Sequence, residues 1–224
     1  MIRIPSILEE FGCDKLWLTA DLHLGDPRQV LLGRPFEDAK ECSDALIDNW
    51  NALVYEKDLV VVVGDWCMDI ANLRWFASCF SGKKILLRGN YDKLDDEDYL
   101  SNGFAAVIPE GEGMLTTLVN DDGQKLNTHI VHYPSLCSPD YFNICGHIHG
   151  AWKVQKNMLN VGVDANHFLP IDVQKVFFYF NAISRFYDQD VWVAGHPANV
   201  VHSTRGKEGT YFESKFTGTL NVPT

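Results

Sequence analysis

Val60-Val61-Val62-Val63-Gly64-Asp65 is the stretch of this sequence that decides the fold. Four consecutive β-branched residues are typical of a strand that is buried on both faces, in the middle of a sheet. Gly64 allows a sharp turn where that strand ends, so Asp65 is expected at the carboxyl edge of the sheet. Ligand sites of α/β proteins lie at this edge. If the stretch stood alone, a simple Gly-Asp turn would explain it equally well.

The segments around this strand alternate between strand and helix patterns. Short strands are expected at residues 15–20 and 85–87, because apolar and β-branched side chains are concentrated there. Apolar residues at helical spacing predict amphipathic helices at residues 36–54 and 69–80. This alternation predicts parallel βαβ units with right-handed crossovers.

The second half of the chain reads mainly as strands. Asn120-Asp121-Asp122-Gly123 predicts a hairpin turn between strands at residues 114–119 and 126–132. Two further apolar strands are expected at residues 141–145 and 158–163. A covering helix is expected at residues 173–187.

Length and composition indicate one large domain with a small addition. The chain has 224 residues, of which 46% are hydrophobic, so a sizeable core can form. We expect a domain over residues 1–187 and a C-terminal appendage of unknown role over residues 188–224, where short β-like runs alternate with Gly, Thr and Asn. No transmembrane span or signal peptide is visible, which predicts a cytoplasmic protein without a membrane partner. The six cysteines show no regular spacing and are expected to be reduced thiols.

The charge balance bears on the class of partner. The formal net charge is −11, and an acidic surface repels nucleic-acid backbones. Extended binding of DNA or RNA is therefore disfavoured. A small phosphorylated substrate remains compatible with this charge, because a bound metal reverses the local sign. The sequence says nothing about the oligomeric state.

Polar side chains follow nearly every predicted strand. Asp-x-His and Gly-His-x-His-Gly each place two side chains on one side of an extended backbone. Two clustered histidines do not help a core, which favours a metal site over a structural role for the second motif. Of His129 and His132, we expect the second to be functional, because it stands at the end of its strand. The side chains expected at one edge are Asp21, His23, Asp65, Asn90, His132, His147 and His149.

This set of donors predicts a site for two metal ions. Seven nitrogen and oxygen ligands exceed what a single tetrahedral ion takes. Mixed imidazole and oxygen donors favour Mn²⁺, Fe, Zn²⁺, Co²⁺ or Ni²⁺ over Ca²⁺ or Mg²⁺, and Mn²⁺ is our first expectation. Two ions about 3.5–4 Å apart are a recurrent device for in-line attack at phosphorus.

The five ordered blocks together resemble the calcineurin-like metallophosphoesterase superfamily. They are Asp-x-His, Gly-Asp, Gly-Asn-x-Asp, a late His and Gly-His-x-His, and the resemblance covers about residues 16–170. The finer pattern resembles small stand-alone bacterial and phage phosphoesterases. Supporting segments are Arg34-Pro35-Phe36, Asn49-Trp50-Asn51 and Asn160-Val161-Gly162-Val163-Asp164.

The resemblance implies both a fold and a set of roles. The fold would be a four-layer α/β sandwich of two mixed β-sheets flanked by helices, with the di-metal site at the carboxyl rim of the strands. Asp65 would bridge two ions, and a metal-bridging hydroxide would attack phosphorus without a covalent enzyme intermediate. Asp21, His23 and His149 would bind one ion, and Asn90, His132 and His147 the other.

One departure from the family pattern concerns the reaction. Many members carry His where this chain has Tyr91, followed by Asp92, and these two residues are the expected catalytic pair. A phenol with an ordinary pKa near 10 donates a hydrogen bond but supplies little positive charge. Because monoester hydrolysis needs more help with charge, Tyr91 favours phosphodiesters. Candidate substrate-binding residues are Arg34, Arg88 and His167.

The function expected from the sequence is therefore a metal-dependent phosphodiesterase acting on a small nucleotide or cyclic nucleotide. Three alternatives remain open. One is a phosphomonoesterase of the same fold, and another is a non-catalytic module that binds metal and a partner. The third, a nuclease on long DNA or RNA, is disfavoured by the net charge.

Overall fold

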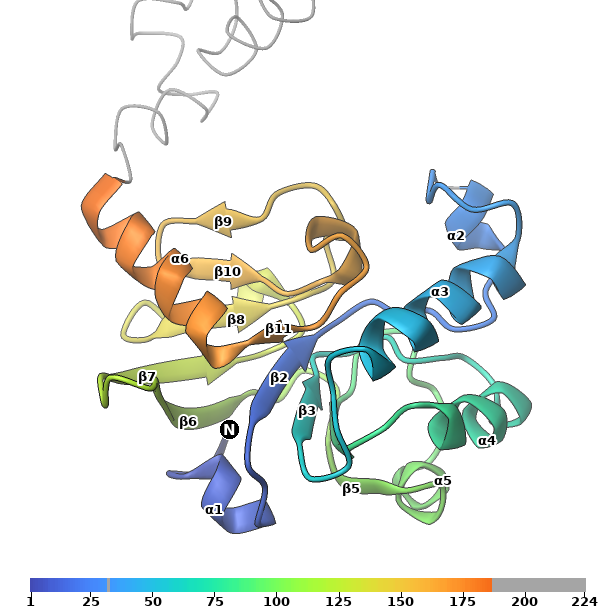
Figure 1. Ribbon diagram of the computed structural model, residues 1–224, viewed down its shortest axis with the longest axis horizontal. Coiled ribbons are helices and arrows are strands. Elements are labelled where there is room, and N and C mark those ends of the chain that lie inside the picture. Colours follow the sequence, from blue (N-terminus) through green and yellow to red (C-terminus); the bar gives the residue numbers. More distant parts are fainter. Residues whose placement is uncertain (32, 187–224) are drawn as a thin grey trace, which may run out of the picture. The chain divides into compact units, whose positions relative to one another are not determined.

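Two β-sheets make up the centre of the described chain, and each contains parallel and antiparallel strand pairs (Figure 1). The computed structural model describes residues 1–31 and 33–186. One sheet has 5 strands in the order β11-β2-β3-β4-β5, and the other has 6 in the order β1-β6-β7-β8-β10-β9. The expected α/β class, with two mixed sheets flanked by helices, is confirmed.

The 5-stranded sheet is built around the valine-rich strand. β2 (Leu16–Thr19), β3 (Leu59–Val62) and β4 (Lys83–Leu87) run parallel, and β5 (Phe104–Ile108) continues in the same direction. Every residue of β3 is buried, as expected for a strand that is covered on both faces. β11 (Ile171–Asp172) pairs antiparallel with β2, which makes this sheet mixed.

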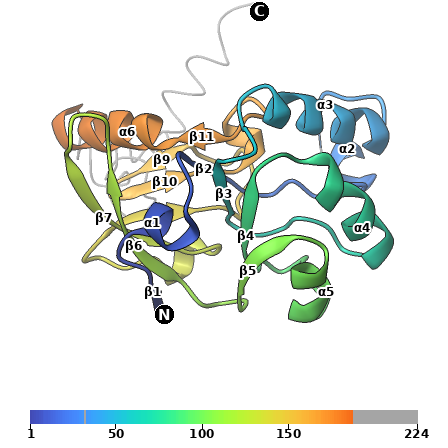
Figure 2. The same cartoon turned by 60° about the horizontal axis from the view of Figure 1, so that its bottom comes forward.

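Two amphipathic helices cover one face of this sheet, close to the positions predicted for them. α3 (Ala39–Asn51) and α4 (Ile70–Cys79) each begin after an aspartate whose carboxylate accepts a hydrogen bond from the first turn. Their buried sides, including Trp50 and Leu73, share one core cluster with Val60 of β3. α5 (Asp96–Ser101) starts within the acidic run Asp95-Asp96-Glu97-Asp98 and lies beside β5 (Figure 2).

The 6-stranded sheet contains the predicted hairpin. β6 (Met114–Val119) and β7 (Lys125–Ile130) pair antiparallel, and β8 (Phe142–Cys145) and β10 (Met158–Asn160) continue parallel to β7. The edges are the short strands β1 (Ile2–Arg3) and β9 (Val154–Gln155). The remaining elements are α1 (Ile7–Phe11), α2 (Arg28–Leu31), the 3-10 turns η1 (Pro134–Leu136) and η2 (Val163–Ala165), and α6 (Val173–Phe186).

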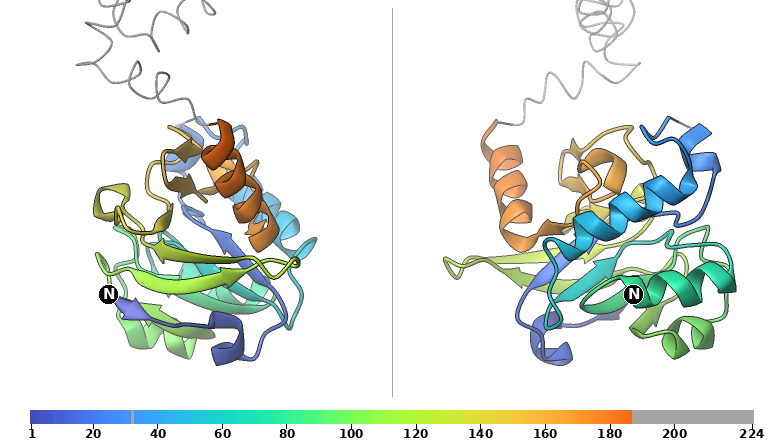
Figure 3. Two further views of the ribbon diagram at one scale, coloured as in Figure 1. Left: turned by 90° about the vertical axis from the view of Figure 1, so that its left-hand side faces the viewer. Right: turned by 45° about the vertical axis from the view of Figure 1, so that its right-hand side comes forward.

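Backbone hydrogen bonds join the carboxyl ends of strands from both sheets. A parallel bridge connects Ala20, which follows β2, to Gly162, which follows β10. Just beyond the ends of β2 and β3, the Asp21 N–H donates to the carbonyl of Gly64. Figure 3 shows the two sheets from two further sides. This junction is where the polar strand-end residues of the sequence meet.

Two expectations concern membranes and the C-terminal segment. Over residues 1–31 and 33–186, no helix has the length and apolarity that a membrane crossing requires. The expected appendage over residues 188–224, and its boundary with the main domain, lie outside the described residues.

Candidate metal centre

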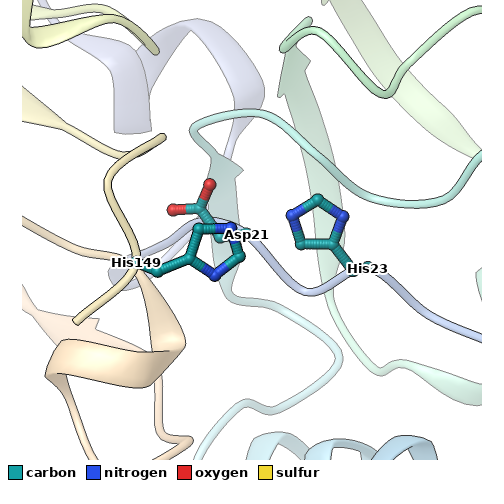
Figure 4. A group of neighbouring side chains, drawn as sticks. All are labelled: Asp21, His23 and His149. Atoms are coloured by element: carbon teal, nitrogen blue, oxygen red, sulfur yellow. The ribbon is translucent and has the colours of Figure 1, made fainter. Parts of the chain in front are cut away.

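Six of the predicted metal ligands form two groups of three. In each group, the candidate ligand atoms lie within 4.8 Å of one another. Figure 4 shows the first group, in which His149 approaches Asp21 and His23 from a different segment of the chain. The first group is Asp21, His23 and His149, and the second is Asp65, His132 and His147.

The Asp65 carboxylate lies between the two groups. Its Oδ2 atom is 3.4 Å from Nε2 of His23 in the first group and 3.5 Å from Nε2 of His132 in the second. Asn90 adds an amide oxygen to the second group, 3.3 Å from Nε2 of His132 and 3.0 Å from Nδ1 of His147. The structure thus brings all seven predicted ligands together, with one carboxylate positioned to be shared.

The backbone at these ligands adopts an uncommon conformation. Eight described residues other than glycine have a positive φ, and five of them belong to the two groups. Left-handed backbone costs an ordinary residue about 1–2 kcal/mol, so it is retained where the surroundings require it. These five are Asp21, His23, Asp65, His147 and His149.

Two glycines allow the ligands to approach the backbone closely. A Cβ atom on Gly89 would lie 2.2 Å from Oδ1 of Asp65, and one on Gly64 would lie 2.2 Å from Nδ1 of His132. No side chain fits at either position without moving a ligand. Glycine is therefore required for steric reasons at the first position of both the Gly-Asp and the Gly-Asn motif.

Hydrogen bonds determine which ring nitrogens can bind an ion. Nδ1 of His132 lies 2.7 Å from the carbonyl of Val63, which can only accept, so Nδ1 carries the proton and Nε2 has the lone pair. His23 is 3% exposed, yet neither of its ring nitrogens has a hydrogen-bond partner in the described part of the chain. A buried polar group without a partner requires an explanation, and a cation near Nε2 of His23 supplies one.

The pKa shifts of the ligand side chains are also consistent with bound cations. Burial raises the pKa of Asp21 to about 8, with a further contribution from the Asp65 carboxylate, and raises the pKa of Asp65 to about 7. Burial also lowers the pKa of His23 to about 3 and that of His132 to about 4. His23 and His132 are therefore neutral, whereas the hydrogen bond to Asp164 raises the pKa of His149. The carboxylates are costly to ionise without positive charge nearby.

Together these observations show a donor set that could hold two divalent metal ions. Buried carboxylates and neutral imidazoles converge, and an orphaned ring lies next to a shared carboxylate oxygen. Imidazole and carboxylate ligands suit Mn²⁺, Fe, Zn²⁺, Co²⁺ and Ni²⁺ alike.

Tyr91 and Asp92, expected to be catalytic, occupy different environments. The Tyr91 ring meets the His23 ring edge-on at 4.6 Å, and its backbone N–H donates to Oδ1 of Asp65. Asp92 is fully buried, and its carboxylate accepts the backbone N–H groups of Asp65, Trp66 and Gly89. These contacts favour a positioning role for Asp92 over the expected catalytic one. Tyr91 remains a candidate catalytic residue, since its ring lies beside the first group.

The three expected substrate-binding residues differ in how their donors are used. Arg34 is only 6% exposed and donates within the protein, and Arg88 donates to the Asp92 carbonyl and to Asp96. These bonds favour structural roles for both arginines. His167 is exposed, has a φ of 58°, and follows η2, the 3-10 turn that contains Asp164. Its role in binding stays a prediction.

The side chains of Asp164 and Tyr133 contact ligand rings, although the sequence predicted no role for either. Asp164 lies 2.9 Å from Nδ1 of His149, and the Tyr133 ring contacts the rings of both His132 and His147 at 4.8 Å. Asp164 could have been recognised as a site residue from its position, because it follows the end of β10 as Asp65 follows the end of β3. Nothing in the sequence separates Tyr133 from other aromatic residues.

Comparison with known proteins supports the fold and no specific activity. No family model matches this chain. An uncharacterised protein of Methanocaldococcus jannaschii is 25% identical over 170 residues, which are 72% of this chain and 89% of that protein. A protein of unknown function from Aquifex aeolicus superposes with a TM-score of 0.57 at 16% identity, covering 74% of this chain and 98% of that one. A nuclease of Pseudomonas putida aligns with a TM-score of 0.38 at 19% identity, covering 60% of this chain and 61% of that one. What the structural likeness to the Aquifex aeolicus protein shows is a shared fold.

Proposed function

We propose that this chain is a di-metal-dependent phosphoester hydrolase of the calcineurin-like type. The observation that carries the proposal is the position of Asp65, whose Oδ2 atom stands within 3.5 Å of an imidazole nitrogen from each of the two groups. A carboxylate shared between two groups of imidazole and oxygen ligands suits two neighbouring divalent ions. Asp21, His23 and His149 would hold one ion, and Asn90, His132 and His147 the other.

The ions, when bound, would supply Lewis acidity and an activated water for attack at phosphorus. The chain's own residues hold these ligands in place. Asp92 accepts two backbone hydrogen bonds from the turn that carries Asp65 and a third from Gly89, which follows β4. The Tyr91 N–H orients the Asp65 carboxylate. The Tyr91 hydroxyl is the proposed hydrogen-bond donor to the substrate, because its ring stands beside His23.

For the substrate we propose a phosphodiester, most suitably a small nucleotide or cyclic nucleotide. A phenol at Tyr91 supplies a hydrogen bond but little charge, and a diester places less negative charge on phosphorus than a monoester does. The net charge of −11 counts against long nucleic acids. The same chemistry could serve a phosphomonoester, and the experiment below compares the two.

The test is hydrolysis of bis-p-nitrophenyl phosphate beside p-nitrophenyl phosphate, with Mn²⁺, Fe²⁺, Zn²⁺, Co²⁺ or Ni²⁺ added to metal-free protein. Asp65→Asn is the diagnostic variant. Asp58→Asn is its matched control, because Asp58 is a buried aspartate (3% exposed) at the opposite end of β3, where it accepts from Trp17 and Tyr55.

We expect metal-dependent diester turnover that is lost in Asp65→Asn and kept in Asp58→Asn. Stronger monoester turnover would retain the hydrolase but contradict the substrate proposal. Metal binding without turnover of either ester would favour the non-catalytic interaction module. Unchanged turnover in Asp65→Asn would remove the two-metal proposal altogether.

A further inference from the structure

The Asp164 carboxylate joins His149 to a buried arginine. Its Oδ2 atom lies 2.9 Å from Nδ1 of His149, and Arg34 donates to both of its oxygens, each at 2.9 Å. The side chains of Arg34 and Asp164 are only 3% and 15% exposed. A two-point Arg–carboxylate pair that is shielded from water has a fixed geometry. His149 is therefore held by a rigid partner.

This contact decides which nitrogen of His149 can bind an ion. Because the Asp164 carboxylate is engaged by Arg34 and can only accept, Nδ1 of His149 carries the proton. In the neutral ring, which is the form that binds an ion, Nε2 then has the lone pair, and this ring stacks against His23 at 5.1 Å. An imidazole whose other nitrogen donates to a carboxylate is both oriented and made more basic as a metal ligand.

Arg34 links this pair to the segment that carries the other ligands of the first group. Its Nη2 atom donates to the carbonyl of Asp21 at 2.5 Å, and Nη1 donates to the carbonyl of Leu22 at 2.8 Å. One guanidinium thus connects the backbone after β2 with the carboxylate after β10. Both segments reach the first group, one through Asp21 and His23 and the other through the ring of His149.

The backbone of His149 is held from the same direction. The side-chain amide of Asn160, at the end of β10, donates to the His149 carbonyl at 2.7 Å. The Asn160 oxygen in turn accepts from the N–H of Gly162 at 2.8 Å. The segment from Asn160 to Asp164 therefore fixes His149 at two points, the carbonyl and the ring.

We infer that Asp164 and Arg34 are a positioning pair for the first metal group, which sets the tautomer and orientation of His149 relative to Asp21 and His23. The inference rests on the proposed function in that the group binds a metal ion. It replaces the substrate-binding role that the sequence suggested for Arg34. The inference also distinguishes the two groups, because within the described residues the hydrogen bonds of this pair reach Asp21 and His149 of the first group and no ligand of the second.

The test measures Mn²⁺ binding by titration calorimetry and by metal analysis after dialysis, so that no turnover is required. We compare Asp164→Asn, Arg34→Lys and Arg34→Met with His149→Ala and with the buried control Asp58→Asn. Losing an outer partner of a ligand typically weakens metal affinity by about 10–100-fold. We expect Asp164→Asn and Arg34→Met to bind one of the two ions about 10–100-fold more weakly, with the other ion unaffected.

Arg34→Lys should recover part of the affinity, because lysine keeps the charge without the two-point geometry. Thermal unfolding of each metal-free variant separates a folding defect from a binding defect. A purely structural pair predicts lower stability with both ions still bound at wild-type affinity, and that outcome would overturn the inference. If wild-type protein binds two ions but hydrolyses no ester, the inference is unaffected and the hydrolase proposal fails. If wild-type protein binds fewer than two ions, both fail.

Discussion

Gly89 leaves room for the Asp65 carboxylate beside the backbone. A Cβ atom there would lie 2.2 Å from Oδ1 of Asp65 and 2.8 Å from the His132 ring. We predict that Gly89→Ala displaces Asp65 and lowers Mn²⁺ affinity by at least about tenfold, which is the range for disturbed ligand support. Titration calorimetry measures this. Gly150→Ala is the control, because its Cβ would come no closer than 3.8 Å to the atoms around it. Equal affinities in the two variants would contradict the steric argument.

Asp92 and Asp58 offer a comparison between two buried aspartates. Asp92 uses both oxygens to accept backbone N–H groups, whereas both donors to Asp58 reach the same oxygen, Oδ2. An asparagine keeps one acceptor oxygen and places an NH₂ where the other stood. Asp92→Asn should therefore lose about 1–3 kcal/mol of unfolding free energy, and Asp58→Asn less. Urea denaturation of the metal-free variants checks the order, and a larger loss in Asp58→Asn would refute it.

At the scale of elements, the last turn of α3 holds the end of α4. The Asn51 side chain donates to the carbonyl of Cys79 at 2.8 Å and accepts from the N–H of Ser81 at 2.9 Å, and Trp50 donates to the Ser81 carbonyl. We predict that Asn51→Ala lowers the unfolding free energy by about 1–3 kcal/mol, because two backbone groups lose their partners. Mn²⁺ affinity should stay at the wild-type value, since none of these contacts involves a metal-group residue. A parallel loss of affinity would show that the helix contact supports the site.

The sequence predicted the elements whose patterns are local and strong. The valine strand, the hairpin after Met114 and the two long helices of the first half all occur within a few residues of their expected positions. Strand-end placement also predicted that seven polar side chains would meet, because parallel strands bring their carboxyl ends to one edge. β11 was not predicted, since a strand of 2 residues has no periodicity to detect.

The roles of the charged residues were harder to predict than their position. Arg34, Arg88 and Asp92 stand in segments near the site, and the sequence suggested contact with substrate or the reacting group. Their hydrogen bonds in the structure are instead made to backbone carbonyls, backbone N–H groups and carboxylates of the chain itself. Whether a charged side chain faces a ligand or the backbone depends on tertiary distances, which a single sequence does not contain.

At the scale of the whole molecule, the buried titratable groups predict a pH dependence of the metal-free protein. Asp21 and Asp65 have folded pKa values of about 8 and about 7, above their unfolded values, so the stability they contribute is lost as the pH rises. His23 and His132 have lowered pKa values, so their contribution is lost only as the pH falls below about 6.5. Between about pH 6.5 and 7.5 the carboxylates therefore dominate, and the metal-free protein should become less stable as the pH rises.

Urea midpoints of the metal-free protein at pH 6.5 and 7.5 measure this trend. Asp21→Asn should flatten it, because the asparagine does not titrate. With Mn²⁺ the trend should reverse, since ions bind the deprotonated ligands and their binding strengthens as the pH rises. A metal-free protein that gains stability across this interval would contradict the assigned environments of Asp21 and Asp65.

The left-handed backbone at five of the candidate ligands implies that folding stability and metal binding favour different residues at these positions. Glycine at each of these positions would relieve the backbone strain, because glycine adopts positive φ without steric cost. Engineering for heat resistance alone would therefore favour glycine at these positions. At Asp21, His23 and Asp65 the same change also removes a buried carboxylate or an imidazole without a hydrogen-bond partner among the described residues. A selection for thermostable variants that ignores metal binding would be expected to erase the site while improving the scaffold around it.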